Sequence, residues 1–388
     1  MASNSRSQGL RQAFAIARRG SQRGNALTFV RGVAMGLLGA SLLVLASGAP
    51  AQPAPVAAAS RVSEVAPAVG DALAQVPTRV RITDVQITSA AGSYIAAEKG
   101  YFREEGIEAE FIATGPDQVP VVVADQADVA GAAINAFLFN AFARGIPIRV
   151  VADHGANLFG ASAGGWVVRR DLVDNGAYQG PATVRGWKVG AATGSVADIA
   201  LDRFLRTGGL AIEDVDMTYL PFPDILTALS NGALDGAYYQ EPFTTIAVDR
   251  GIVMRGPIGY DIYPNQQIAG VLFSEKLLSD RATAIRYLRA YTRGIRDYVK
   301  AMVERDPAAF NEIVPILIEH TTVKDRALFE KSVPSGLNPD PLLNVQSIVD
   351  DQEWYIEHGY QTQRVNVADM VDLSMIEEVI RQLGPAKR

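Results

Sequence analysis

The chain has 388 residues, of which 48% are hydrophobic and 20% are charged, a composition typical of a globular protein large enough for two domains. Its formal net charge is −6. Residues 52–388 are more acidic than this value suggests, because residues 1–51 hold six arginines and no Asp or Glu. This balance argues against a nucleic-acid partner, since phosphate binding requires clustered Lys and Arg.

Residues 1–51 have the organisation of a secretory signal peptide. A basic stretch ending at Arg31 precedes an uncharged apolar run, and Ala49-Pro50-Ala51 fits an A-x-A cleavage site. The apolar run is short and Gly-rich for a membrane span. We therefore predict export to the periplasm with cleavage after Ala51, and an uncleaved membrane anchor is the alternative.

Residues 52–77 are rich in Ala, Pro and Val without a clear period, which predicts a flexible linker. From Thr78 onward, short β-rich runs alternate with helical runs, a pattern that predicts an α/β fold with parallel strands. The predicted strands are 80–88, 108–112, 128–131, 146–152, 166–168, 187–190, 217–220, 237–239 and 268–273. The predicted helices among these strands are 93–105, 135–144 and 195–206.

The pattern changes after Asp280, where helical periodicity takes over. Residues 281–303 form a long amphipathic run, followed by helical segments at 307–319, 345–358 and 374–383. We therefore expect two α/β lobes, with the C-terminal helices packed on one of them.

A search for catalytic or metal-binding patterns finds little. The three histidines are far apart and there is no cysteine, so we expect no metal, no cofactor and no enzymatic activity. Residues 160–164 match G-x-S-x-G, but a predicted strand follows where a nucleophile elbow requires a helix. His154, in a loop after a strand, is the one histidine that we expect to reach a ligand.

Polar residues follow several predicted strands at the point where a helix begins. Thr193 and Ser195 stand at one such turn, Ser89 and Ser93 flank another, and Asn135 begins a third. Backbone N–H groups at helix starts, together with these side chains, offer hydrogen bonds to a ligand, and ligands of open α/β sheets bind at the carboxyl ends of strands. The alternative is that each side chain simply caps its own helix.

The segment 238–243, Tyr-Tyr-Gln-Glu-Pro-Phe, follows another predicted strand. Its rings offer stacking surfaces, its glutamine both donates and accepts, and Glu241 accepts hydrogen bonds. We therefore count Tyr239 and Glu241 as candidate ligand contacts, and the alternative is a strand end with two core tyrosines.

These segments, in this order, resemble the nitrate/sulfonate/taurine-type (NitT/TauT) substrate-binding proteins of ABC transporters, including relatives linked to thiamine-pyrimidine precursors. The stretch 96–107, AAEKGYFREEGI, is similar to the family's AxxKGYFxxEGL motif. Residues 228–237, 241–243 and 371–374 resemble further family segments, and the similarity extends over about residues 80–385.

The resemblance implies a type II periplasmic-binding fold, in which two lobes joined by a two-strand hinge close on a ligand. Lobe I would comprise 78–168 and 269–388, with the C-terminal helices, and lobe II would comprise 169–268. It also implies a small-molecule solute, a transient contact with an ABC permease in the inner membrane, and a monomer. The ligand contacts that it implies are Ser89, Ser93, Asn135, Thr193, Ser195 and Glu241.

The candidate turns differ from those expected for anion binding, because none contains Lys or Arg and Glu241 adds an acid. We therefore favour a neutral or cationic ligand, such as a pyrimidine-like heterocycle, over a sulfonate or nitrate. The aromatic rings proposed to stack on it are those of Trp166, Phe222, Tyr238 or Tyr239. Two alternative functions are a membrane-tethered ligand sensor and an enzyme resembling the pyrimidine synthases, although the latter carry a cysteine-rich motif.

Overall fold

The structure is a computed structural model that describes residues 77–113, 118–162, 164–192 and 196–387. The predicted signal peptide, all but the last residue of the predicted linker, and the candidate residues Thr193 and Ser195 lie outside these described residues. None of the helices within the described ranges is long and apolar enough to cross a membrane.

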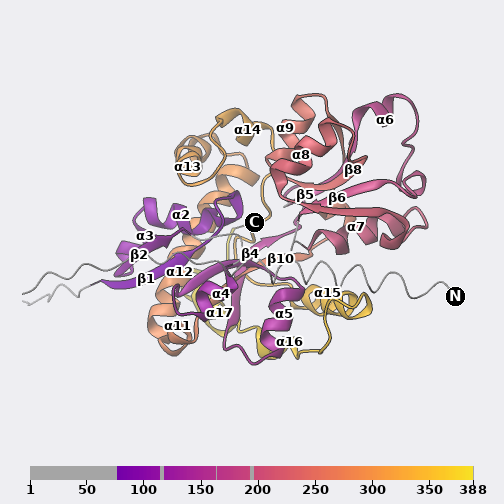
Figure 1. Cartoon of the computed structure of the whole chain (residues 1–388). Helices are drawn as coiled ribbons and strands as arrows, with labels where there is room; N and C mark the ends of the chain where they lie inside the picture. Colours follow the sequence, from indigo (N-terminus) through magenta and orange to yellow (C-terminus); the bar gives the residue numbers. More distant parts are fainter. Residues whose placement is uncertain (1–76, 114–117, 163, 193–195, 388) are drawn as a thin grey trace, which may run out of the picture. The chain divides into compact units, whose positions relative to one another are not determined.

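Two sheets form the framework (Figure 1). Each has five strands, in the orders β2-β1-β3-β10-β4 and β7-β6-β8-β5-β9. The first sheet contains β1 (Thr78–Thr83), β2 (Ile107–Ile112), β3 (Val129–Ala133), β4 (Arg149–Ala156) and β10 (Gln267–Phe273). The second contains β5 (Gly164–Arg169), β6 (Lys188–Ala192), β7 (Asp216–Leu220), β8 (Gly236–Gln240) and β9 (Val253–Ile258). We call the first sheet and the helices packed on it the first half, and the second sheet and its helices the second half.

The chain crosses between the sheets twice, before β5 and before β10. These two strands are the antiparallel members of their sheets, since β5 runs antiparallel to β8 and β9, and β10 to β3 and β4. The predicted α/β class and the two crossovers are therefore confirmed. The strand pairing moves the predicted boundaries slightly, because residues 164–168 belong to the second sheet and 267–268 to the first.

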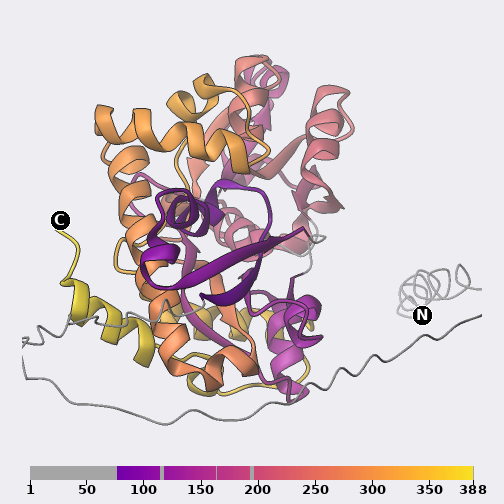
Figure 2. The same cartoon turned by 90° about the vertical axis from the view of Figure 1, so that its left-hand side faces the viewer.

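Helices cover both faces of the first sheet. Alternate side chains of its central strands enter different cores, with Val129 and Val271 facing one and Ala130 and Leu272 the other. Helices α2 (Ala91–Glu98), α12 (Arg281–Tyr298), α13 (Pro307–His320) and α17 (Ser374–Leu383) supply the first core. Helices α5 (Ala136–Ala143) and α15 (Val345–Glu357) supply the second. Figure 2 shows the C-terminal helices, in orange and yellow, beside the strands of the first sheet.

The second sheet has the same three-layer arrangement. Trp166 and Val168 pack against α7 (Ala197–Arg206), while Val167 between them faces α8 (Phe222–Ser230) and α9 (Phe243–Asp249). This alternation along a strand with both faces covered explains why its residues are apolar throughout.

Shorter helices connect these elements. They are α3 (Tyr101–Glu104), α4 (Val119–Val123), α6 (Arg170–Asp174), α10 (Gly259–Ile262), α11 (Glu275–Ser279), α14 (Arg326–Lys331) and α16 (Val367–Met370), with 3-10 turns at Thr88–Ala90, Pro181–Thr183 and Ile212–Asp214. The helix predicted over 93–105 is interrupted because Gly100 adopts a left-handed φ of 76°. The long helix predicted over 281–303 ends as a π-helical turn at Val299–Val303.

Strand β9 is absent from the sequence-based prediction. It contains Gly256 and Pro257, two residues that normally interrupt strands. Because β9 lies at the edge of its sheet, one side of its backbone needs no partner strand, and the proline is tolerated there.

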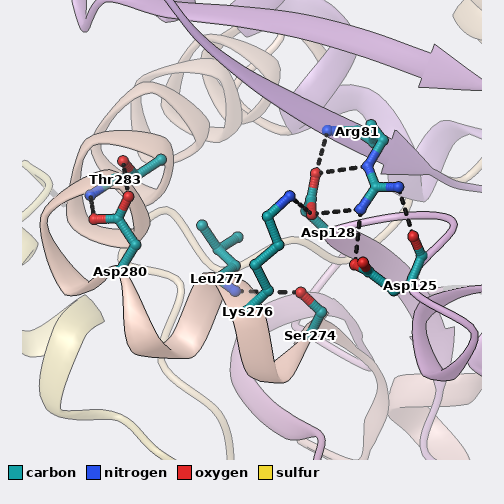
Figure 3. Close-up of polar contacts among 8 residues, drawn as sticks. All are labelled: Arg81, Asp125, Asp128, Ser274, Lys276, Leu277, Asp280 and Thr283. Carbon is teal, nitrogen blue, oxygen red and sulfur yellow. Dashed lines mark hydrogen bonds and ion pairs between the residues drawn. The ribbon is translucent and has the colours of Figure 1, made fainter.

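A network of charged side chains fixes the start of the first half (Figure 3). Arg81 of β1 donates to both carboxylate oxygens of Asp128, at 2.8–3.0 Å, and to Asp125. Although burial acts to raise the pKa of Asp128, hydrogen bonds from Arg81 keep it below its ordinary value. The neighbouring Ser274 and Asp280 cap α11 and α12 through Leu277 N and Thr283 N. These contacts stabilise the fold and lie outside the set of residues that line the cavity described next.

Candidate functional site

A cavity of about 230 Å³ is lined by residues of both sheets. From the first half come the segment after β1, the end of β3 and part of β10; from the second come the end of β6, the start of α7 and the end of β8. The polar side chains on its wall are Ser89, Gln118, His154, Tyr238, Gln240 and Ser335. The wall is otherwise made of glycines and apolar residues such as Ile87, Phe222 and Ile268.

This location follows from the topology of the two sheets. Strands β1 and β3 run parallel in the first sheet, as do β6 and β8 in the second. The turns at their carboxyl ends therefore gather at one edge of each sheet, where open α/β proteins bind ligands. The cavity wall brings together the segments around Ser89, Ala192 and Gln240.

The one imidazole on the wall belongs to a buried network. His154 Nε2 lies 3.1 Å from Asp84 Oδ2, and its Nδ1 lies 3.1 Å from the Tyr291 hydroxyl. Tyr291 donates its single proton to the carbonyl of Asp153, at 2.9 Å, so its oxygen must accept from Nδ1–H. With Nε2 also facing a carboxylate, this geometry favours a doubly protonated ring paired with Asp84.

The electrostatics of this network agree with the hydrogen bonds. Burial alone would lower the pKa of His154, but the charge and hydrogen bond of Asp84 outweigh it, and the pKa is raised above 6.5. The charged pair is nearly fully buried and its two charges compensate each other. His154 therefore contributes little net charge to the cavity.

Space for the pair depends on a glycine of the neighbouring strand. A Cβ atom at Gly131 would lie 2.2 Å from His154 Nε2 and 2.6 Å from Asp84 Oδ2. Real Cβ atoms do not approach other atoms so closely, so Gly131 of β3 allows the ion pair to pack against the sheet.

Of the eight candidate residues, the structure places Ser89 and His154 on the cavity wall. Ser93 is buried, with its hydroxyl 3.1 Å from that of Tyr287. Asn135 caps α5 by accepting from Leu138 N at 3.2 Å. Neither Ser93 nor Asn135 lines the cavity. The direct contact of Ser89 or His154 with a ligand remains a prediction.

The two candidates after β8 point elsewhere. Tyr239 is fully buried among the residues of the core beneath α8 and α9, and its hydroxyl donates to the carbonyl of Phe222 at 2.6 Å. Tyr238, the preceding residue, lines the cavity instead, because successive side chains of a strand face opposite sides. The proposed stacking positions are thus reduced to Tyr238 and Phe222, since Trp166 is also a core residue.

Glu241 is buried beside the cavity without lining it. Its carboxylate pairs with Arg255 and accepts from the backbone and hydroxyl of Thr245, at 3.1 and 2.7 Å. It also faces Val333 N at 3.4 Å. The inference that Glu241 adds uncompensated negative charge to the cleft is therefore corrected, because Arg255 balances it.

The sequence-based prediction missed part of the wall. Ser335 and Gly336 belong to the long loop between α14 and α15, and they line the cavity. A Cβ at Gly336 would meet the carbonyl of Ala156 at 2.0 Å, so the loop lies directly on the crossover between the sheets. Its Ser- and Pro-rich composition indicates a loop, but only the tertiary fold brings it to the cavity.

Two sequence-based expectations about catalytic chemistry can be compared with the described residues. They contain no cluster of three or more His, Cys, Asp or Glu residues that could hold a metal ion. Ser162, of the G-x-S-x-G match, is buried, accepts from Tyr260 N at 2.9 Å and precedes strand β5. It lacks the strand-to-helix turn that exposes a nucleophile.

Two mixed five-stranded sheets, two crossovers and a cavity at the carboxyl ends of their strands define the type II periplasmic-binding fold. The chain belongs to the NMT1/THI5-like family, whose model matches residues 87–301, more than half of its length. The resemblance to NitT/TauT-type substrate-binding proteins is confirmed by this match and by the structural similarities that follow.

Solved structures with the same fold are similar over most of this chain. The alkanesulfonate-binding protein SsuA from Xanthomonas axonopodis pv. citri, bound to MOPS, superposes with a TM-score of 0.60 at 18% identity, covering 77% of this chain and 99% of its own. The nitrate-binding protein NrtA from Synechocystis PCC 6803 gives 0.61 at 15% identity, covering 79% and 89%. The desulfurization enzyme DSZB gives 0.58 at 13% identity, covering 79% and 99%. No curated protein sequence matches the chain significantly.

Proposed function

We propose that this protein is the substrate-binding component of an ABC importer, which holds one small solute in the cavity between its two sheets and delivers it to a membrane permease. The observation that carries the proposal is the cavity itself, lined by strand ends of both sheets. Movement of one half relative to the other would open and close it. The family membership and the solved binding proteins of the same fold support this function.

The ligand that the cavity fits best is small, neutral and partly aromatic. Among the described residues that line it there is no Lys, Arg, Asp or Glu, and His154 is neutralised by Asp84. Phe222 and Tyr238 offer ring faces, while Gln118, Gln240 and Ser335 offer amide and hydroxyl groups. A pyrimidine-like heterocycle has this combination of a flat ring and hydrogen-bonding nitrogens.

The short segments that interrupt the described ranges contain no Lys or Arg in the sequence either. By sequence, residues 114–117 are Thr-Gly-Pro-Asp, residue 163 is Ala, and residues 193–195 are Thr-Gly-Ser. A fully ionised sulfonate or nitrate would therefore have to be held by neutral hydrogen-bond donors alone. Desolvating such an anion without a cationic partner is costly, so we expect the cavity to discriminate against it.

The proposed location is the periplasm, reached by the predicted N-terminal signal, and the proposed partner is an inner-membrane permease. The nitrate-binding protein NrtA, which shares the fold, is itself described as periplasmic. Mass spectrometry of the protein recovered from the periplasm tests the signal, with a mature N-terminus near Gln52 as the expected result.

A thermal-shift screen of the purified mature protein tests the ligand class. The screen should include aminopyrimidines and a matched pair, benzenesulfonamide and benzenesulfonate, which share a shape but differ in charge. A neutral heterocycle that binds should raise the melting temperature by at least about 3 °C at 100 times its Kd. Binding of benzenesulfonate in preference to its neutral counterpart would contradict the neutral-ligand proposal.

An enzymatic role is the second candidate, because the desulfurization enzyme DSZB shares the fold. The DSZB structure in complex with biphenyl-2-sulfinic acid is of a variant in which a cysteine is replaced by serine, whereas this chain contains no cysteine. We therefore favour binding over turnover. Incubating the purified protein with 2-arylsulfinates and assaying for released sulfite tests the alternative, and we expect no release above background.

A further inference from the structure

Helix α7 of the second half and helix α15 of the first half meet beside the cavity. Helix α7 of the second half begins at the cavity wall, where Ala197 lines it, and α15 packs on the first sheet. The indole of Trp354 on α15 donates to Asp202 Oδ2 on α7 at 3.0 Å. Ile199 of α7 belongs to the same apolar cluster as Ile348 of α15. The two halves are therefore in direct contact through these helices.

Three aspartates lie at this contact, and one is fully compensated. Asp202 accepts from Arg206 at 2.7 Å, from Trp354 and from the backbone N of Ile212 at 3.0 Å. Although burial acts to raise the pKa of Asp202, these donors lower it below its ordinary value. Asp202 is therefore ionised in the assembled contact.

Asp351 of α15 differs because its carboxyl is fully buried without a cation bound to it. Its Oδ2 accepts from Gln266 at 3.1 Å, and its Oδ1 has no hydrogen-bond partner among the residues that the structure describes. Burial raises the pKa of Asp351 to about 7, against smaller opposing effects of Gln266, Tyr263 and Arg203. The neighbouring Asp350 adds to the rise.

Asp198, in the first turn of α7, also has a raised pKa, but the rise is smaller than that of Asp351. Its Oδ2 accepts from the Tyr219 hydroxyl at 2.7 Å, and its buried Oδ1 has no partner in the described part of the chain. Burial raises the pKa of Asp198 to about 6, opposed by Tyr219 and by His358 at the end of α15. Tyr355 of α15 lies within electrostatic range of both Asp198 and Asp351.

We propose that the carboxyl groups of Asp351 and Asp198 take up protons when α7 and α15 come together, so that acidic solution favours contact between the two halves and closure of the cavity. The inference rests on the proposed function only in assuming that the halves separate and rejoin around a ligand. Separation of the two helices would admit water to this contact, and a carboxyl that becomes exposed ionises at its ordinary value.

The direction of the effect follows from proton linkage. Both carboxyls have a raised pKa in the assembled contact and the ordinary value of 3.8 when exposed. Below pH 3.8 they are protonated in both states, so the full contribution is present. As pH rises from about 4 to about 7, ionisation of each carboxyl lowers the equilibrium constant for the contact by up to about tenfold per pH unit. Above its raised pKa, a carboxyl causes no further change.

The first experiment compares urea unfolding of the full-length mature protein with that of Asp351→Asn, without ligand, from pH 5 to pH 8. Because Asn imitates the protonated carboxyl, the folding equilibrium constant of the wild type should fall relative to the variant by on the order of 100-fold. Asp198→Asn should show a difference of about tenfold, and it keeps the test decisive if Asp351→Asn folds poorly. Asp202→Asn is a matched control at the same contact, in which the wild-type pH dependence should persist.

The second experiment follows the contact itself through Trp354. In a Trp187→Phe background, acrylamide quenching should report mainly on Trp354, because Trp166 is fully buried in the core. Quenching should increase from pH 5 to pH 8, and in Asp351→Asn it should stay low. A wild-type-to-variant stability ratio that is constant with pH overturns the proposal, as does quenching that is unaffected by pH or by the substitution. No ligand is used, so a failed ligand screen would challenge the proposed function without deciding this inference.

Discussion

Charged side chains near the cavity are paired within the protein, and this pairing decides what they leave for a ligand. His154 is held by Asp84 and Tyr291, and Glu241 by Arg255 and Thr245. Each of these groups is buried, where an unpaired charge would be strongly destabilising. The wall of the cavity is therefore close to neutral even though ionisable residues lie directly behind it.

Replacing Glu241 by Ala should lower the free energy of unfolding by about 2–4 kcal/mol, because Arg255 and the Thr245 donors would lose their buried acceptor. Ligand affinity should stay within about twofold, since Glu241 does not line the cavity. Urea denaturation and ligand titration measure the two quantities separately. Glu108→Ala is a suitable control, because Glu108 is exposed on β2. A loss of affinity with unchanged stability in Glu241→Ala would indicate that Glu241 contacts the ligand.

At the scale of elements, the strand-turn-helix units position the site. The segment after β1 and the ends of β3, β6 and β8 all contribute to the wall, as expected for parallel strands whose turns share one edge. Not every polar residue at such a turn is free to bind a ligand, because the helix that follows has unsatisfied N–H groups of its own. Asn135 is used for capping, since its side chain accepts a hydrogen bond at the start of α5.

Asn135→Ala should therefore destabilise the protein by about 1 kcal/mol through loss of the cap, without changing ligand affinity. Thermal unfolding and titration with the ligand identified by the screen measure the two effects. Asn135→Asp is the conservative control, because aspartate caps helices equally well and should keep nearly full stability. A fall in affinity in the alanine variant alone would indicate that Asn135 contacts the ligand.

At the scale of the whole molecule, the two halves share a cavity and a helix contact, so ligand binding and closure are expected to be coupled. A neutral ligand in a neutral cavity should bind with little dependence on ionic strength. We expect its Kd to change by less than about twofold between about 50 mM and about 500 mM NaCl, because screening acts on net charges. Isothermal titration calorimetry measures this, and a Kd that rises steeply with salt would indicate recognition of an ion.

The sequence alone determined the architecture. Alternating strand and helix periodicity predicted the two α/β halves, and the change after Asp280 predicted the C-terminal helices, because local side-chain patterns report which face of each element is buried. The helix break at Gly100 and the proline-containing strand β9 were not predicted, because side-chain periodicity shows neither a backbone break nor an edge position.

Only the tertiary structure decided which polar residues face the cavity. Tyr238 and Tyr239 are adjacent in sequence, yet one lines the cavity and the other lies in the core. Ser335 reaches the wall from a loop far along the chain, while Glu241 is turned away to meet Arg255. The physical reason is that side-chain direction and charge compensation depend on contacts between distant segments, which local sequence patterns do not contain.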